Sequence, residues 1–130
     1  MSTNRRLSML LALCVGPAAA SPLDGLLQDY RDTAGALDPA RGAAAWTRPM
    51  PAPDGKPRRC SDCHGNDLAR AGRHLRTGKP IPPLAPSVSP DALSDTAKLE
   101  KWLYRNCRWT WGRECTPQEK GDLLLFLSIQ

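Results

Sequence analysis

The chain has 130 residues, a formal net charge of +5 and 41% hydrophobic residues, with 13 Pro and 5 Cys. This length holds one domain, which excludes a catalytic domain joined to a separate regulatory domain. The basic side chains form no stripe interleaved with aromatic residues, so the charge does not indicate a nucleic-acid-binding protein, and docking onto a partner protein fits it better.

The first twenty residues have the three parts of a secretory signal. An arginine pair precedes an apolar run at 7–15, and small residues follow up to Ala20. The run is far shorter than the roughly 18 to 20 residues of a permanent membrane span. We expect cleavage after Ala20, leaving residues 21–130 as one exported, periplasmic domain. Two weaker alternatives are a lipoprotein cut before Cys14, where the preceding residue is too large, and twin-arginine export, whose signal is otherwise incomplete.

Two helices are expected before residue 50. The first begins at the Ser-Pro pair 21–22, and its apolar residues at 23, 26, 27 and 30 share one face. The second begins at the Asp-Pro pair 38–39 and places Gly42 and Trp46 four residues apart on one face. A small residue beside a large one lets another helix cross closely, and we expect the last helix of the chain to do so.

The strongest local signal is the motif CSDCH at 60–64. Cys60 and Cys63 have the spacing that joins two thiols to the vinyl groups of a haem, and a His directly after the second thiol reaches the iron. The motif therefore predicts one covalent haem c, with His64 as the proximal axial ligand.

Two other interpretations of the motif fit less well. A zinc site needs a second Cys/His pair, whereas seven residues lie between Cys107 and Cys115, and His74 is the only other histidine. A thioredoxin-like dithiol needs a strand before it, whereas two arginines and a Pro-rich stretch precede this one.

An extended loop is expected between the motif and residue 90. The run KPIPPLAP at 79–86 forbids a helix because its prolines lack amide hydrogens and clash with the preceding turn. Such a loop suits a wall against a flat cofactor, and one of its proline carbonyls is expected to accept the free N–H of His64. Residues 49–57 fit either a similar wall or a solvated linker.

Two further helices complete the chain. The first, 94–107, places Leu99, Trp102, Leu103 and Asn106 on one face. A polar residue on a buried face is costly unless something satisfies it, and a haem iron would satisfy Asn106. The last helix begins with the capping box TPQE at 116–119 and has an apolar stripe at 123, 124, 126 and 127.

Several residues are candidates for the second axial ligand. No methionine follows the haem motif, and Met50 precedes it in a Pro-rich segment. His74 lies only ten residues after His64 and would need a tight loop to reach the opposite face. Thiolate ligation by Cys107 or Cys115 is chemically possible, but an oxidising compartment favours a disulfide between them.

Asn106 or an open position completes the set of candidates. An amide is a weak ligand for iron, so a diatomic molecule could displace it. The structural alternative is that Asn106 caps the end of its helix.

Four pieces of sequence together resemble a known family. They are RTGKPIPPLAPS at 76–87, LEKWLYRNC at 99–107, GRECTP at 112–117 and the Glu-Lys pair at 119–120. The chain resembles the SHP proteins, oxygen-binding monohaem cytochromes c of class I, from about Ser21 to its C-terminus. Departures are the tryptophans 109 and 111 between the two late cysteines, and a short insertion beside His74.

The resemblance implies an all-α class I cytochrome c fold, with helices and a Pro-rich loop wrapped around one covalent haem. It implies axial ligation by His64 and by Asn106, which leaves on reduction so that O2 or NO binds, and a disulfide between Cys107 and Cys115. It also implies a dihaem cytochrome c as electron donor, with a membrane cytochrome b upstream.

The sequence therefore predicts a periplasmic cytochrome that accepts electrons, binds a diatomic ligand and has no permanent membrane span. The resemblance implies that it is a terminal redox component that reacts with O2 or NO. The alternative is a permanently six-coordinate electron shuttle, and a haem sensor or storage protein is a weaker third. Trp102, Trp109 and Trp111 are candidates to shield the distal side or to belong to the core. Arg73, Arg76 and Lys79 would meet haem propionates or an acidic donor, or form a solvated face.

Overall fold

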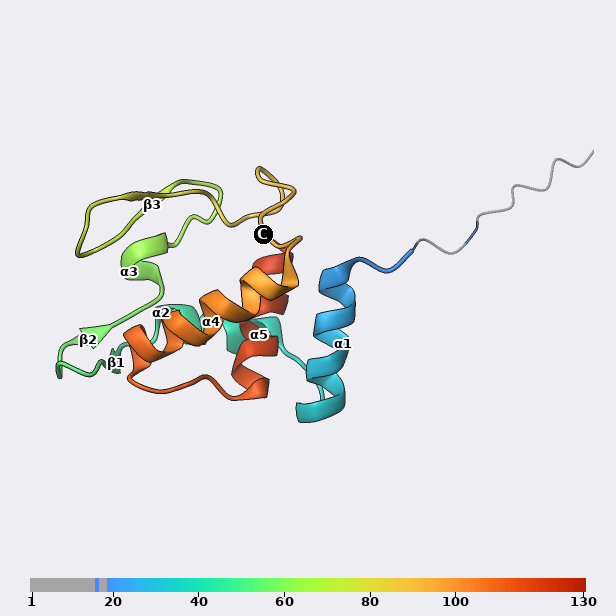
Figure 1. The fold of residues 1–130 in the computed structure, drawn as a ribbon, viewed down its shortest axis with the longest axis horizontal. Helices are drawn as coiled ribbons and strands as arrows, with labels where there is room; N and C mark the ends of the chain where they lie inside the picture. Colours follow the sequence, from blue (N-terminus) through green and yellow to red (C-terminus); the bar gives the residue numbers. More distant parts are fainter. Residues whose placement is uncertain (1–15, 17–18) are drawn as a thin grey trace, which may run out of the picture.

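Five helices and two small hairpins make up the part of the chain that the computed structural model describes, residue 16 and residues 19–130 (Figure 1). Nearly all of the predicted export signal, residues 1–20, lies outside the described residues. No helix among the described residues is both long and apolar enough to cross a membrane.

The three helices with proline starts form where they were predicted. Helix α1 (Pro22–Ala34) has a capping box between Ser21 and Asp24, and α5 (Pro117–Ser128) has one between Thr116 and Glu119. Helix α2 (Pro39–Thr47) is capped by the carboxylate of Asp38, which accepts the N–H of Ala40. In each case the side-chain oxygen satisfies an amide that the helix itself leaves free.

The predicted close crossing of α2 and α5 is confirmed. A Cβ atom at Gly42 would overlap the carbonyl group of Asp122 and lie 2.7 Å from the Cβ of Phe126, so the backbones meet where only glycine fits. Asp122 is 4% exposed, and its carboxylate accepts the backbone N–H of Asp38 and Nε of Arg41, each at 2.7 Å. Helix α1 also packs against α5.

Helix α4 (Thr96–Trp111) is longer than the predicted helix 94–107. Asp95 caps its start, and it ends at Gly112, whose φ of +70° is the left-handed conformation that closes a helix. The extra turn buries Thr110 and Trp111. Asn106 therefore lies inside the helix, and the interpretation that it caps the helix end is wrong.

Two antiparallel hairpins flank the short helix α3 (Ser61–His64) and were not predicted. Strand β1 (Met50–Pro51) pairs with β2 (Pro57–Arg58), and β3 (Gly72–Arg73) pairs with β4 (Pro80–Ile81). The Pro-rich run at 79–86 is otherwise extended, as predicted. Ala52, inside the first hairpin, is 5% exposed, so residues 49–57 are not a simple solvated linker.

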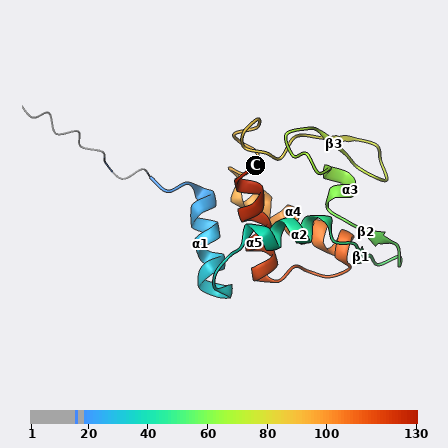
Figure 2. The same cartoon turned by 180° about the vertical axis from the view of Figure 1, so that it is seen from behind.

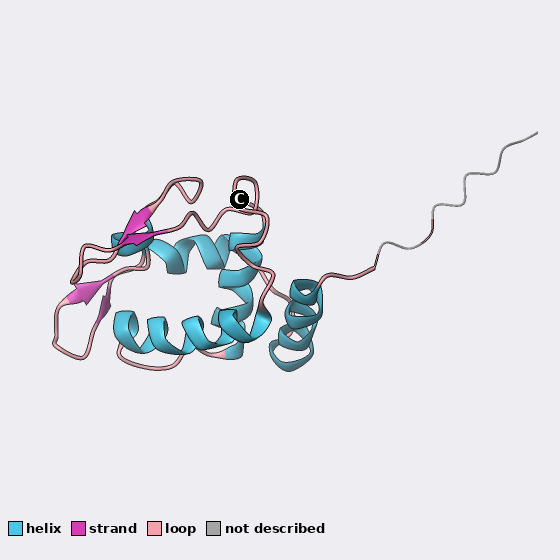
Figure 3. Ribbon diagram, turned by 45° about the horizontal axis from the view of Figure 1, so that its top comes forward, coloured by secondary structure: helices cyan, strands magenta, loops and turns pink. Residues whose placement is uncertain are grey.

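The core lies where α1, α2, α4 and α5 converge, and its most buried side chains include Leu124, Leu68 and Leu123. Helix α4 packs closely against α1 and strands β1 and β2, while α2 and α5 pack tightly on each other. Figures 2 and 3 show α1 at one end of the molecule and the hairpins at the other, with α2, α4 and α5 between them. The fold is all-α in character, as predicted.

Candidate haem site

The two thiols of the CxxCH motif lie on one short helical turn. Cys60 precedes α3 and Cys63 lies within it, and both are half-buried and form no disulfide with a described residue. The carboxylate of Asp62 accepts the backbone N–H of Arg59 at 2.8 Å, which fixes the start of the turn. Burial raises the pKa of the Cys60 thiol to about 11. The turn therefore presents two free thiols, three residues apart, with that of Cys60 held neutral by burial.

His64 completes this turn as a neutral imidazole. Burial lowers the pKa of His64, and the charge of His74 lowers it further. Its Nδ1 is buried and has no hydrogen-bond partner among the described residues, so the expected proline acceptor is not seen here. The ring centroid lies 5.4 Å from that of Trp46, whose Nε1–H donates to the carbonyl of Gly65 at 2.9 Å. Trp46 thus fixes the backbone directly after the motif and packs beside the imidazole of His64.

Gly72 lets strand β3 lie directly against the motif, which sequence reasoning missed. A Cβ atom there would overlap the carbonyl oxygen of Cys63 and come within 2.8 Å of the Cα of His64. The backbone N–H of Leu75 also lies 3.4 Å from Sγ of Cys63. A glycine in a loop carries no signal of its own in a single sequence, because turns also favour it.

Asn106 is half-buried on α4, and its side chain makes no hydrogen bond to any described residue. Leu99 and Leu103, on the same helical face, pack against the core, as predicted. Trp102 differs from the prediction, because it is 44% exposed and lies beside the guanidinium of Arg105. The amide of Asn106 is therefore free to bind a further group.

These residues fit a haem c. Two thiols stand at the attachment spacing, a neutral imidazole follows them with an unpartnered buried nitrogen, and an amide without a hydrogen bond lies on α4. Among the described residues, no three His, Cys, Asp or Glu side chains gather to hold a metal ion by themselves.

Cys107 and Cys115 are joined by a disulfide in the structure, with their Cα atoms 5.6 Å apart. Both residues are buried. The bond connects the residue after Asn106 to the segment that leads into α5. It therefore holds the C-terminal third of α4 against the start of the last helix.

Trp109 joins three segments around the motif. The guanidinium of Arg58 lies 3.9 Å from its ring centroid and that of Arg76 lies 5.6 Å away, while the ring of His74 is 6.4 Å away. Nδ1 of His74 accepts the backbone N–H groups of Arg76 and Thr77, each at 3.2 Å. Trp109 is thus part of a cationic cluster, whereas Trp111 is buried in the core.

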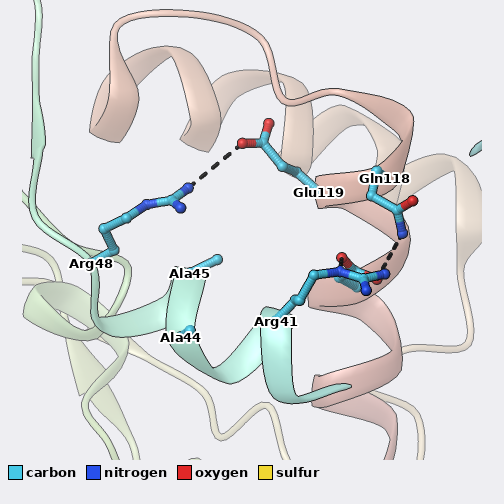
Figure 4. Close-up of a pocket in the computed structure, with 7 residues that line it drawn as sticks. Arg41, Ala44, Ala45, Arg48, Gln118 and Glu119 are labelled. Atoms are coloured by element: carbon cyan, nitrogen blue, oxygen red, sulfur yellow. Dashed lines mark hydrogen bonds and ion pairs between the residues drawn. The ribbon is translucent and has the colours of Figure 1, made fainter. Parts of the chain in front are cut away.

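A separate hollow between α2 and α5 is a poor candidate for a site. Figure 4 shows that its polar lining residues pair with one another: Arg48 with Glu119 at 3.6 Å and Gln118 with Asp122 at 3.0 Å. No thiol of the motif, nor His64 or Asn106, lines it. Its charges are already satisfied.

Comparison with known proteins adds two kinds of finding. Residues 32–127 match a family model described as a domain of unknown function, DUF1924. The chain is 47% identical over 131 residues to "Cytochrome c-type protein SHP" of Cereibacter sphaeroides, covering 96% of this chain and 98% of that protein. It is 36% identical over 86 residues to "Cytochrome c''" of Methylophilus methylotrophus, covering 66% of this chain and 60% of that protein.

Comparison with solved structures finds the same two proteins as the comparison of sequences. The structure of oxidized SHP, described as an oxygen-binding cytochrome c, aligns with a TM-score of 0.76 at 45% identity, covering 86% of this chain and all of that one. Oxidized cytochrome c'' from M. methylotrophus aligns with a TM-score of 0.72 at 31% identity, covering 81% and 91% of the two chains. The helical architecture described above is therefore shared with both proteins.

Proposed function

The chain belongs to the SHP family of cytochromes c and is a haem cytochrome, and from this we propose that it is a periplasmic single-haem protein that accepts electrons and binds O2 or NO. The proposal includes export with cleavage after Ala20. It also includes a dihaem cytochrome c as donor, with a membrane cytochrome b upstream.

Each residue of the site has a distinct part in this proposal. Cys60 and Cys63 would form thioether bonds that fix the cofactor covalently, and His64 would provide a lasting nitrogen ligand. A haem c held here would supply an iron that changes oxidation state and binds a small molecule. Asn106 would be the second protein ligand of the oxidised iron and would be released on reduction. The Cys107–Cys115 disulfide keeps the Asn106 segment in place while the amide moves.

The observation that carries the proposal is the state of the Asn106 amide. It is half-buried, lies inside a regular helix and has no hydrogen-bond partner among the described residues. An amide oxygen is a hard, weak ligand compared with imidazole or thioether sulfur, so a diatomic molecule competes with it readily. The oxygen-binding description of the aligned SHP structure supports the same assignment.

The first experiment is the optical spectrum of the holoprotein, reduced without oxygen and then exposed to carbon monoxide. We expect a broad high-spin ferrous spectrum that shifts at once on adding the gas. Sharp low-spin bands that the gas does not move would contradict the proposal and favour the alternative of a permanently six-coordinate electron shuttle.

Asn106→Ala tests the ligand assignment directly. We expect covalent haem to remain and the ferric iron to become five-coordinate or water-ligated, because the amide is gone. Asn66→Ala, at an exposed asparagine close to the motif, is the matched control and should keep the wild-type ferric spectrum. A ferric spectrum indifferent to Asn106→Ala would show that another residue is the sixth ligand.

A further inference from the structure

Charge is divided between the two ends of the molecule. Residues 54–79, which contain the motif and most of both hairpins, have seven Lys or Arg against three Asp. Residues 21–38, mainly α1, have one Arg against four Asp. Figure 1 places α1 and the hairpins at opposite ends, so the chain has a charge dipole whose positive end surrounds the motif.

Part of the positive charge is free to meet a partner. Arg58 and Arg59 are already paired with Asp54 and Asp62. Four cations in or just before the second hairpin differ, since they are exposed and form no ion pair with any described residue: Arg70, Arg73, Arg76 and Lys79. Of these, Arg76 also lies over the ring of Trp109. We call this surface, together with Leu75, the hairpin face.

The hairpin face is held in one conformation by its own backbone. The N–H of His74 donates to the carbonyl of Lys79 at 2.9 Å, and Gly78, with φ of +67°, donates back to the carbonyl of His74 at 2.8 Å. Arg73 Nη1 donates to the carbonyl of Gly78 at 2.7 Å. The hairpin is therefore an ordered scaffold, which lowers the entropic cost of binding.

An apolar side chain stands among these cations. Leu75 is 56% exposed, and its backbone N–H contacts Sγ of Cys63. An apolar centre with a charged rim is the usual composition of a protein–protein contact. The hairpin face thus combines the features of a docking surface with direct contact to a thiol that attaches the cofactor.

We propose that the hairpin face is the docking surface for an acidic, electron-donating protein. This rests on the proposed function and names the chemistry of the donor's surface, a carboxylate-rich patch around an apolar spot. The dipole turns the motif toward that patch during encounter, and salt screens this attraction. A membrane surface fits less well, because a single exposed leucine on a hairpin lacks the apolar stripe of an interfacial helix.

The test is voltammetry of the holoprotein on gold covered with a carboxylate-terminated monolayer, which stands in for the acidic partner. We expect the wild-type protein to exchange electrons at low salt and to lose most of its adsorbed signal near 0.15 M salt, where the screening length is about 8 Å. Arg70→Glu/Lys79→Glu, at exposed cations whose side chains hold no other part of the structure, should lower the rate or the adsorbed signal about tenfold through repulsion.

The matched control is Lys98→Glu/Lys101→Glu, which makes the same change of charge at exposed lysines of α4. It should lower the signal less than the hairpin variant does. Equal losses in the two variants would overturn the proposal, as would co-sedimentation of the holoprotein with phosphatidylserine vesicles at about 0.15 M salt. Both variants should keep the wild-type response to carbon monoxide, so failure of docking is separable from failure of the proposed function.

Discussion

Two side chains of the described residues have a buried nitrogen without a hydrogen-bond partner, Nδ1 of His64 and Nε1 of Trp111. Such a group costs about 1–3 kcal/mol when nothing pairs with it. The amide of Asn106 also makes no hydrogen bond, but it is only half-buried, so water can reach it. A bound cofactor that interacts with the imidazole of His64 would remove this free-energy cost at the motif.

His74 is the residue that separates the proposed function from its alternative. Its Nδ1 is occupied by two backbone N–H groups of its own turn. We therefore expect His74→Ala to leave the ferric spectrum of the holoprotein unchanged. The measurement is the optical and electron paramagnetic resonance spectrum, with His64→Ala as the contrasting variant that must change both. A changed spectrum in His74→Ala would identify a bis-histidine iron.

At the level of elements, the sequence predicts the helices whose starts are marked by residues close to the helix end. Capping boxes and Pro starts gave the beginnings of α1, α2 and α5, because these signals lie within four residues of the helix end. The two hairpins could not be predicted, since two-residue strands have no periodicity. The last turn of α4 forms because Thr110 and Trp111 become buried, a tertiary effect that lies beyond the local pattern.

The crossing of α2 and α5 yields a prediction about stability. Gly42→Ala should destabilise the protein by about 1–3 kcal/mol or more, because the new methyl group overlaps the backbone of Asp122. Gly25→Ala is the matched control within α1, where no atom lies within 4 Å of the new Cβ. It should stabilise by about 0.5–1 kcal/mol through helix propensity. Urea unfolding measures both, and a neutral Gly42→Ala would contradict the close crossing.

At the scale of the whole molecule, segments distant in sequence hold the site together. Helix α1 and helix α5 pack side by side from the two ends of the described chain, and Glu100 of α4 is hydrogen-bonded to Tyr30 of α1 and, at 3.2 Å, to Lys120 of α5. The motif and the helix that carries Asn106 could be predicted from sequence, whereas this framework depends on contacts across 20 to 70 residues. The positions of the site residues therefore depend on the packing of the whole fold.

The disulfide should contribute to the stability of this framework. Cys107→Ala/Cys115→Ala removes a closed loop of nine residues, 107–115, whose chain-entropy value is about 2.6 kcal/mol. We expect a free energy of unfolding lower by about that amount, measured in urea. Adding a reductant should destabilise the wild-type protein toward the variant and leave the variant unchanged. If the reductant had no effect on the wild-type protein, the thiols would be unpaired in solution.

Because Trp46 packs against His64, its fluorescence should report whether a chain has received its haem. With the two ring centroids 5.4 Å apart, the indole would lie next to any haem that His64 binds. Haem absorbs in the range where tryptophan emits, so energy transfer would quench Trp46 in every molecule that contains haem. In every haem-free molecule Trp46 would stay fluorescent. Ultraviolet emission of a purified batch would then count the fraction of chains that never received their cofactor, without any added dye.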